Sequence, residues 1–341
     1  MDLIEATAET ARQLVAAGKG ILAADESSPT IKKRFDSIDV ESTEENRRDY
    51  RQLLFTTEGI EEFISGVILF DETIRQKTDD GTPLPELLVR RGIIPGIKVD
   101  QGKIDLTFFP GEKITEGLDR LGERLEEYRS LGARFTKWRA VITIIGDTIP
   151  SPVCIEANAA ALARFAALSQ KAGLTPIVEP EVLMDGKHTI ERCEEVTLAA
   201  LDAVFSRLRE HRVVLEGTLL KPNMVLPGKE CPQQSGPEDV AEATIRTFRP
   251  VVPAAVGGIV FLSGGQSPEE ATANLDALNR AAPQPWELSF SFGRALQQPV
   301  LAAWRGKAEN ADTAQQALYR RARLNSLARR GEYSPDMEKD S

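Results

Sequence analysis

The 341 residues suit either about two domains or one α/β barrel, which uses about 250 residues or more. Hydrophobic side chains make up 41% of the chain and charged ones 28%, with 25 glycines and 20 prolines, so disordered, collagen-like and coiled-coil classes are excluded. A formal charge of −10 makes nucleic acid and anionic membrane surfaces poor partners.

Short apolar runs alternate along the chain with longer segments of helical periodicity. The runs lie at residues 20–24, 66–70, 93–98, 136–144, 175–179, 213–220, 258–262 and 287–292. Because they do not alternate polar with apolar side chains, they indicate strands that are buried on both faces of a parallel sheet. Between them, a leucine-rich stripe at 118–131 predicts a helix, and Ser267-Pro268-Glu269-Glu270 predicts a helix start with a capping box.

Eight such runs separated by helices predict a (β/α)8 TIM barrel. No linker divides the chain, so we expect one domain over residues 1–341, with a short, loose polar tail at about 332–341. A doubly wound open sheet is the alternative, but no run is followed by G-x-G-x-x-G at the start of a helix.

Several features bear on location. The first twenty residues lack the basic and apolar regions of a signal peptide. The longest nearly apolar run, at 250–262, is shorter than the roughly 18 residues of a membrane span. The chain has three widely spaced cysteines and no CxxC pair: Cys154, Cys193 and Cys231. We therefore expect reduced structural thiols in a cytoplasmic protein that contacts no membrane.

Polar groups stand at the end of every run, where a barrel carries its chemistry. They are Asp25, Asp71, Lys98, Lys137, Glu179 with Glu181, Lys221, Ser263-Gly264-Gly265 and Arg294. Three lysines and several carboxylates are thus predicted to converge on one mouth. The two histidines, His188 and His211, are unclustered and expected at the surface, so no metal site is predicted.

Lys221 is the strongest candidate for a catalytic nucleophile. It follows Leu219-Leu220 at the end of a buried run, and Pro222 holds it in an extended conformation. Burial removes its hydration and the charges of Lys98 and Lys137 repel its own, and both effects favour the neutral amine that attacks a carbonyl. The alternative is a surface lysine, which is the usual state of this residue type.

Three carboxylates accompany that amine. Glu179 and Glu181 are two residues apart on a strand, so both face the same side. Glu179 is the better candidate for acid–base work, because imine formation expels water and needs a proton donor. For Glu181 a salt bridge to a lysine is an equal alternative. Asp25 either caps a helix or orients a substrate hydroxyl and balances the lysines.

Two segments could bind anions. Ser263-Gly264-Gly265 precedes a helix, so its backbone N–H groups and the helix dipole favour a phosphate, and Gly293-Arg294 completes that site. Lys33-Arg34 could bind a second anion, although a solvated helix face is the usual role of such a pair.

Nine stretches in order, between about residues 5 and 335, together resemble class I fructose-bisphosphate aldolases. They are GILAADES, GVILFDET, GIKVD, TKWRAV, IVEPEV, LEGTLLKPNM, FLSGGQS, SFGRAL and NSLARRGEY. The resemblance implies a (β/α)8 barrel that needs no metal or other cofactor and is commonly a homotetramer. It also implies reversible cleavage of fructose 1,6-bisphosphate to dihydroxyacetone phosphate and glyceraldehyde 3-phosphate in glycolysis and gluconeogenesis.

The resemblance also implies roles for individual residues. Lys221 matches the Schiff-base lysine and Glu179 the proton-transfer residue, while Asp25, Lys137 and Glu181 match accessory catalytic positions. The implied substrate-binding residues are Ser263, Gly264, Gly265, Ser291, Gly293 and Arg294 for one phosphate, and Arg34 and Lys33 with Lys98 for the other, with Arg139 also in the active site.

The chain departs from the family pattern at some positions. Thr30 stands where a serine is common, and Asp71 where animal members often have histidine. The longer tail that ends in a tyrosine is missing, so we expect proton transfer through Glu179, Glu181 or water. Two other readings stay open at this stage: a Schiff-base enzyme for another sugar phosphate, such as a transaldolase or deoxyribose-phosphate aldolase, and a silent barrel that serves as a scaffold.

Overall fold

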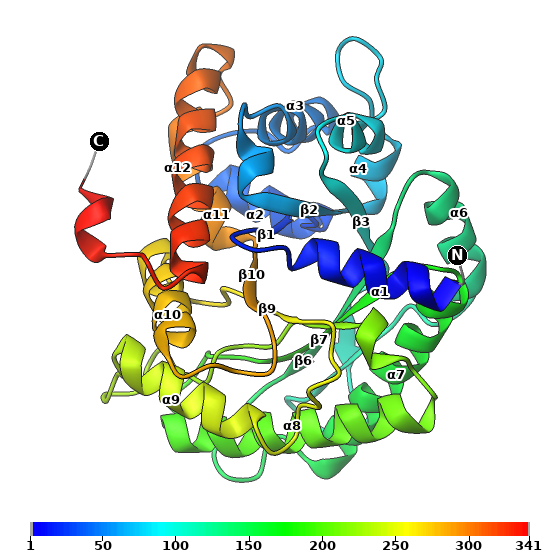
Figure 1. The fold of residues 1–341 in the computed structure, drawn as a ribbon, viewed down its shortest axis with the longest axis vertical. Coiled ribbons are helices and arrows are strands. Elements are labelled where there is room, and N and C mark those ends of the chain that lie inside the picture. Colours follow the sequence, from blue (N-terminus) through cyan, green and yellow to red (C-terminus); the bar gives the residue numbers. More distant parts are fainter. Residues whose placement is uncertain (1–2, 340–341) are drawn as a thin grey trace.

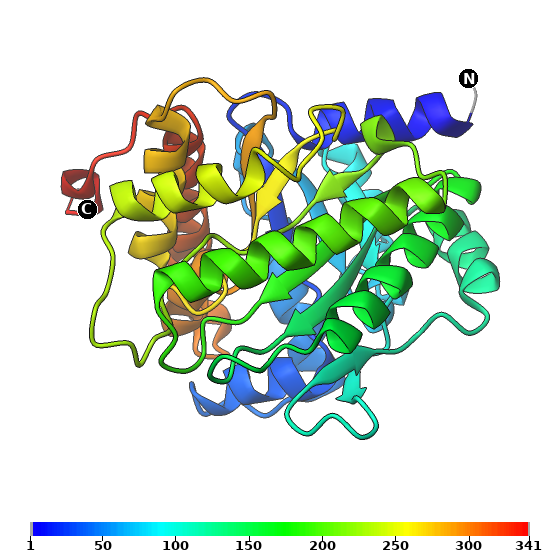
Figure 2. The same cartoon turned by 90° about the horizontal axis from the view of Figure 1, so that it is seen from below.

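A closed barrel of eight parallel strands forms the centre of the computed structural model, which describes residues 3–339 (Figures 1 and 2). Around the barrel the strands follow the order β1-β10-β9-β8-β7-β6-β3-β2. Their bounds are β1 Gly20–Ala23, β2 Ile64–Leu69, β3 Ile94–Lys98, β6 Phe135–Ile142, β7 Thr175–Val182, β8 Leu219–Leu220, β9 Ile259–Phe261 and β10 Leu288–Phe292. Each predicted run contributes one strand, and the predicted (β/α)8 fold is confirmed.

Helices lie between successive strands and surround the barrel, as Figure 2 shows. They are α1 Leu3–Leu14, α2 Ser28–Asp36, α3 Glu44–Phe55, α4 Asp71–Arg75, α5 Leu84–Arg90, α6 Leu121–Ser130, α7 Pro152–Lys171, α8 Ile190–Glu210, α9 Pro237–Phe248, α10 Pro268–Arg280, α11 Arg294–Trp304 and α12 Ala311–Arg329. The predicted start of α10 is confirmed, since Ser267 and Glu270 form a complete capping box.

Two segments differ from the expectation. The run at 213–220 is a strand only in β8, because a 3₁₀ helix occupies Leu215–Gly217. An apolar run shows that a segment is buried, not that it pairs as a strand. In addition, β4 (Lys103–Asp105) and β5 (Lys113–Thr115) form an antiparallel hairpin between β3 and α6. Its strands are short and largely polar, so they contain no apolar run from which they could be predicted.

The inside of the barrel is packed at the amino ends of its strands. Ala11 and Leu14 of α1, with Val15 just after it, join Phe135 and other barrel side chains in one buried cluster, and α1 lies across this end in Figure 1. Gly96 makes room for the Phe135 ring, because a Cβ added to Gly96 would lie 2.3 Å from that ring. With this end filled, the opposite end is left for a cavity.

Over residues 332–339 the C-terminal tail is folded against the body, not loose as its composition suggested, and the last two residues of the predicted tail lie outside the described range. A 3₁₀ helix spans Pro335–Glu338, and the Glu338 carboxylate accepts hydrogen bonds from Arg321 of α12 and from the Tyr333 hydroxyl. Arg321 is buried, and composition gives no sign of such a distant partner. Within residues 3–339, no helix combines the length and the apolar character needed to cross a membrane.

Candidate active site

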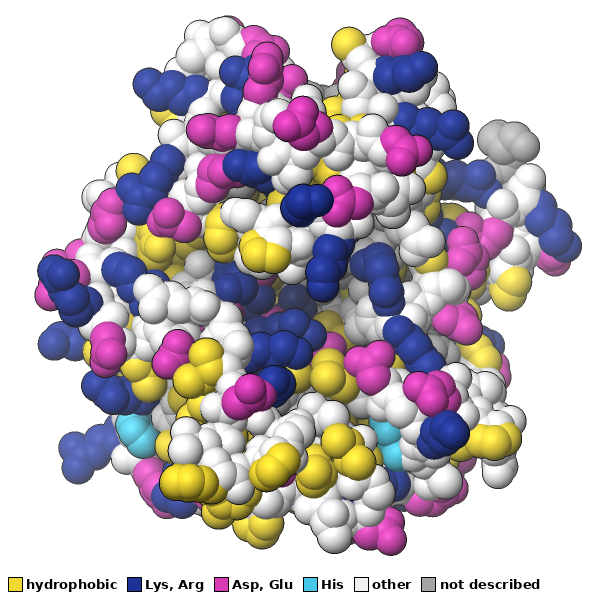
Figure 3. Space-filling model, turned by 180° about the vertical axis from the view of Figure 1, so that it is seen from behind, with side chains coloured by type: hydrophobic (Ala, Val, Ile, Leu, Met, Phe, Trp, Pro, Cys, Tyr) yellow, Lys and Arg dark blue, Asp and Glu magenta, His cyan; other side chains and the backbone are white. Residues whose placement is uncertain are grey.

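A cavity of about 900 Å³ opens at the carboxyl ends of the barrel strands. It is the hollow lined by dark blue basic side chains in Figure 3. Side chains from the ends of all eight strands line it, as the sequence predicts: Asp25, Asp71, Lys98, Lys137, Glu179, Glu181, Lys221, Ser263 with Gly264, and Arg294. The parallel barrel thus brings together residues that are almost 270 positions apart in the chain.

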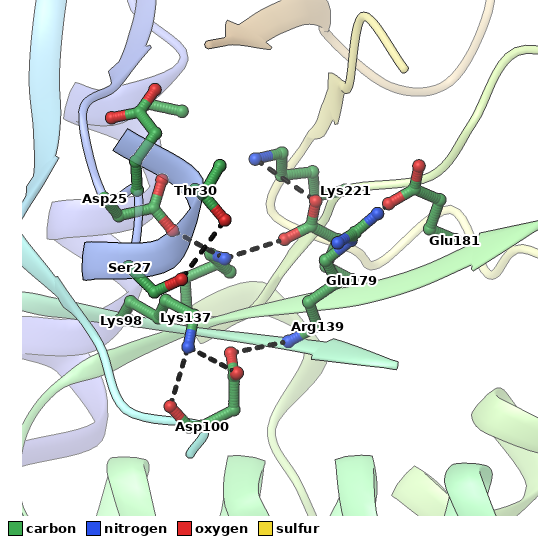
Figure 4. A network of polar contacts seen from close by, with 12 residues as sticks. Asp25, Ser27, Thr30, Lys98, Asp100, Lys137, Arg139, Glu179, Glu181 and Lys221 are labelled. Atoms are coloured by element: carbon green, nitrogen blue, oxygen red, sulfur yellow. Dashed lines mark hydrogen bonds and ion pairs between the residues drawn. The ribbon is translucent and has the colours of Figure 1, made fainter. Parts of the chain in front are cut away.

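A row of four ionisable side chains lies at the bottom of this cavity (Figure 4). Lys137 Nζ is 2.7 Å from Asp25 Oδ2 and 3.3 Å from Glu179 Oε2, and Glu179 Oε1 is 3.3 Å from Lys221 Nζ. Asp25 follows β1, Lys137 is in β6, Glu179 is in β7 and Lys221 follows β8. The register partner of Glu179 in β6 is Arg139, and Lys221 follows Leu220, the β8 partner of Val178. Lys137 lies two residues before Arg139 and so on the same face of β6. Its side chain meets those of Asp25 and Glu179 inside the barrel, so the two lysines alternate with the two carboxylates.

Attraction between opposite charges keeps Asp25 and Lys137 ionised. Burial alone would raise the pKa of Asp25, but the charges of Lys137 and Lys221, and then of Lys98, hold it well below its ordinary value. Burial would likewise lower the pKa of Lys137, but Asp25 and Glu179 raise it well above the usual lysine value. Lys137 is therefore a permanent buried cation, and Asp25 does not titrate near neutral pH.

These positions define what the four groups can do. Lys221 presents a buried amine at the bottom of an open cavity, within reach of a ligand carbonyl. The carboxylate of Glu179 lies beside that amine and can take its proton or return one to an oxygen leaving the same carbon. Lys137 and Asp25 offer a donor and an acceptor to a neighbouring hydroxyl.

Two further ion pairs form the cavity wall. Arg139 Nε donates to Glu181, so Glu181 forms a salt bridge as one interpretation expected, but its partner is an arginine and not a lysine. Burial would lower the pKa of Arg139, but Glu181 raises it. Lys98 Nζ is 2.5 Å from Asp100 Oδ1, and Asp100 also accepts from the Arg139 backbone N–H. The sequence analysis missed Asp100, although its place two residues after a strand-end lysine was a usable signal.

A polar pocket at the ends of β9 and β10 suits an anion. Ser263, Gly264, Ser291, Gly293 and Arg294 all line the cavity there, and α11 begins at Arg294. The Ser291 hydroxyl is buried and has no hydrogen-bond partner among residues 3–339, and the Arg294 guanidinium donates to the Gly264 carbonyl. Burial and the positive charge of nearby Arg34 lower the pKa of Arg294, so two cations repel each other at this end of the cavity.

Gly265 is not in the cavity lining, unlike the other members of that loop. Its N–H lies 3.0 Å from the Met184 sulfur, so that donor points away from the cavity. A Cβ added to Gly265 would lie 2.0 Å from Lys229 Cε. Gly265 thus packs against the ends of the Lys229 and Met184 side chains, whereas the sequence suggested contact with the anion.

Only one of the two basic residues predicted on α2 reaches the cavity. Arg34 lines it and is 2.5 Å from Glu26 Oε1. Lys33 is exposed on α2 and lies outside the lining. Buried Glu26 also binds Arg51 at 2.6 Å and accepts from Gln297 at 2.8 Å. No local pattern marks this buried network, because Arg34, Arg51 and Gln297 lie on three separate helices and Glu26 lies in a loop.

The remaining candidates are structural. No group of histidine, cysteine and acidic side chains within residues 3–339 could hold a metal ion. All three cysteines are buried free thiols, and burial raises the pKa of Cys193 to about 11. His211 is exposed as expected, but His188 is half-buried, and its ring nitrogens have no partner among the described residues. Burial and Arg192 lower the pKa of His188, so the ring stays neutral.

Comparisons with known proteins agree with this geometry. Residues 6–341 match the family described as "Fructose-bisphosphate aldolase class-I". The chain is 57% identical to the probable fructose-bisphosphate aldolase class 1 of Xanthomonas axonopodis pv. citri, over 97% of this chain and 99% of that protein. It is 55% identical to the Arabidopsis thaliana protein named "Fructose-bisphosphate aldolase 5, cytosolic", over 98% and 93% respectively.

A solved structure is similar over nearly the whole fold. It is fructose-bisphosphate aldolase from Plasmodium falciparum, in a ternary co-crystal structure with TRAP and a small-molecule inhibitor. The TM-score is 0.97 at 53% identity, and the match covers 98% of this chain and 96% of the other.

Proposed function

Because the chain belongs to the class I fructose-bisphosphate aldolase family, we propose that Lys221 is the residue that forms the covalent intermediate. The enzyme is a metal-independent carbon–carbon lyase of glycolysis that acts on a phosphorylated sugar, fructose 1,6-bisphosphate. The observation that carries the assignment is the buried Lys221 amine at the end of β8, 3.3 Å from the Glu179 carboxylate.

The reaction begins with imine formation. The neutral Lys221 amine adds to the C2 ketone, which forms a C–N bond and converts the carbonyl oxygen to a hydroxyl. Glu179 donates the proton with which that hydroxyl leaves as water, and an iminium remains. The positive nitrogen then acts as an electron sink for the next bond to break.

Cleavage follows when the C4 hydroxyl gives up its proton to a carboxylate at the bottom of the cavity, Asp25 or Glu179. The C3–C4 bonding electrons move to the iminium, which releases glyceraldehyde 3-phosphate and leaves an enamine on Lys221. Protonation at C3 and hydrolysis of the imine release dihydroxyacetone phosphate. Lys137, held charged by Asp25 and Glu179, stabilises negative charge on the C4 oxygen as the bond breaks.

Binding residues follow from the position of the ketone. The phosphate next to C2 binds where β9 and β10 end beside Lys221, on Ser263, Gly264, Ser291, Gly293 and Arg294. Arg34, Lys98 and Arg139 line the rest of the mouth. Lys33 and Gly265, which the resemblance also assigns to phosphate binding, lie outside the cavity lining.

Assembly and location complete the proposal. The chain acts as one barrel domain, assembled as a homotetramer in the cytoplasm. Support comes from the family resemblance, from the cytosolic Arabidopsis relative and from the three reduced thiols. Light scattering coupled to gel filtration measures the mass of the assembly directly.

Trapping tests the central assignment. Borohydride reduction in the presence of dihydroxyacetone phosphate fixes the imine as a stable amine, and peptide mass spectrometry then locates it. We expect the triose adduct on Lys221 and none in Lys221→Arg, because a guanidinium is never neutral in a protein. An adduct on Lys98 or Lys137 contradicts the proposal.

A further inference from the structure

Nine basic side chains line the cavity, and one of them lacks a partner. Six of the nine pair with carboxylates: Arg34, Arg75, Lys98, Lys137, Arg139 and Lys221. Arg124 and Arg294 donate to backbone carbonyls. The side chain of Lys103 has neither a hydrogen bond nor an ion pair to any residue in the described range 3–339, although it lines the same cavity.

The hairpin that carries Lys103 is fixed to the barrel wall. Lys103 begins β4 and is paired with Thr115 of β5. The Thr115 hydroxyl donates to the backbone carbonyl of Arg139 at 2.8 Å, which ties the hairpin to β6. Lys103 therefore projects from a positioned strand, and not from a free loop.

The surroundings of Lys103 favour an anion. Lys103 is exposed, but its partial desolvation, followed by repulsion from Arg139 and Lys113, lowers the pKa of its ammonium group. Glu181 and Asp185 also face Lys103 and act in the opposite direction, but neither approaches within ion-pair distance. Glu181 is already bound to Arg139, so its charge is shared. A ligand phosphate would supply the counter-charge that this group lacks.

The barrel order places Lys103 across the mouth from the first phosphate pocket. In the closed order of eight strands, β3 stands opposite β9 and β6 stands opposite β10. The first pocket lies at the ends of β9 and β10, and the Lys103 hairpin lies over β3 and β6. A sugar with its ketone at Lys221 and one phosphate in the first pocket extends its other end toward the opposite wall.

We propose that Lys103 is a specificity-determining residue that binds the substrate phosphate farther from the ketone. This rests on the proposed function, because the position of Lys221 fixes which end of the sugar reaches the hairpin. The residues to which the resemblance assigned this phosphate either are paired with carboxylates or lie outside the cavity lining. Arg34 is bound to Glu26, Lys98 to Asp100, and Lys33 lies outside the cavity.

Steady-state kinetics with two substrates test the proposal. Fructose 1,6-bisphosphate carries the distal phosphate and fructose 1-phosphate lacks it. For Lys103→Met we expect KM for the bisphosphate to rise about tenfold, the loss of one charge-assisted contact, with kcat little changed. Both constants for fructose 1-phosphate should stay at the wild-type values. Lys103→Arg should restore most of the affinity.

Lys113→Met is the matched control. Lys113 is on the partner strand of the same hairpin and is paired with Asp105, and it does not line the cavity. Its loss removes the same charge but should leave both KM values within twofold of wild type. An equal rise of KM for both substrates in Lys103→Met, or no rise for either, overturns the proposal. Failure of the proposed function is seen separately, as absence of the borohydride adduct from wild-type Lys221.

Discussion

Lys137 illustrates how a single buried charge organises this site. It lies between Asp25 and Glu179 and is itself almost fully buried, so its ammonium group is held by two carboxylates. An isolated buried ammonium would lose its proton, but here the carboxylates reverse that tendency. The same cation keeps the pKa of Asp25 low. Of the three lysines that lower the pKa of Asp25, Lys137 has the largest effect.

Lys137→Met should lower kcat steeply and change its pH dependence. Loss of the cation leaves Asp25 and Glu179 as neighbouring buried carboxylates, which raises the pKa of Asp25. Transition-state stabilisation by such a group is worth about 10²- to 10³-fold in kcat. Since a protonated Asp25 cannot accept a proton, the acid limb of the kcat profile should move to higher pH. A pH series of initial rates measures both effects.

Lys32→Met is the control for that variant, because Lys32 is exposed and pairs only with Asp36 within α2. Its pH profile should match wild type. An unshifted acid limb in Lys137→Met, despite a reduced rate, would show that Lys137 does not set the charge of Asp25.

The ion pair between Asp25 and Lys137 also makes the stability of the fold depend on pH. The folded-state pKa of Asp25 is below its value in the unfolded chain, so its contribution to stability is complete above about pH 4 and is lost as the pH falls further.

At the scale of elements, the barrel is fixed by how aromatic rings and glycines alternate inside it. Phe135 of β6 occupies the space that Gly96 of β3 and Gly66 of β2 leave open. Phe290 of β10 occupies the space beside Gly20 of β1 in the same way. Large side chains on one strand thus require glycine on a neighbour, which is how a barrel interior reaches close packing.

Gly96→Ala should destabilise the fold. The added methyl would lie 2.3 Å from the Phe135 ring, which is fully buried and has no free space to enter. Overpacking of this kind costs about 1–3 kcal/mol, so the melting temperature should fall by several degrees. Differential scanning fluorimetry measures the change.

Gly122→Ala is the matched control. Gly122 is in the α6 helix, where a Cβ would meet nothing within 4 Å. Alanine there should raise stability by about 0.4–1 kcal/mol, since glycine is the poorer helix former. A melting temperature of Gly96→Ala at or above wild type would refute the packing argument.

At the scale of the whole molecule, the cavity and the C-terminal tail are separate. Within the described range, residues 332–339 do not line the cavity. The tail is instead held by Glu338, which binds Arg321 and the Tyr333 hydroxyl. Its acidic residues are also poor bases beside a phosphorylated substrate, because like charges repel. We therefore predict that residues 332–339 contribute to stability and not to proton transfer.

Deletion of residues 335–341 should leave cleavage within about twofold of wild type and lower the melting temperature. The truncated chain keeps Lys221 and Glu179 but leaves buried Arg321 without its carboxylate, which costs about 1–3 kcal/mol. Cleavage rates, solvent-proton exchange of dihydroxyacetone phosphate and thermal melting measure the three properties.

Two point variants separate the causes. Glu338→Gln should reproduce most of the loss in stability, whereas Asp336→Asn should not, because Asp336 pairs only with exposed Lys339. A steep loss of proton exchange in the truncated chain, with the borohydride adduct retained, would show that the tail takes part in catalysis.

The sequence by itself determined the barrel and the residues at the bottom of its cavity. Buried strands are marked by continuous apolar runs, and a parallel barrel gathers the residues at their carboxyl ends. Lys221, Glu179, Lys137 and Asp25 were found for that reason. These signals are local, since each needs only a strand and the residue that follows it.

Only the tertiary structure decided which charges meet and which side chains enter the cavity. Arg34 faces the mouth and adjacent Lys33 does not, because successive residues of a helix point about 100° apart and packing fixes the rotation. Glu26 with Arg51, Lys98 with Asp100, and Lys103 on its hairpin depend on distances between segments that no local pattern records. The length of β8 and the docking of the tail through Arg321 were decided in the same way, by contacts between distant parts of the chain.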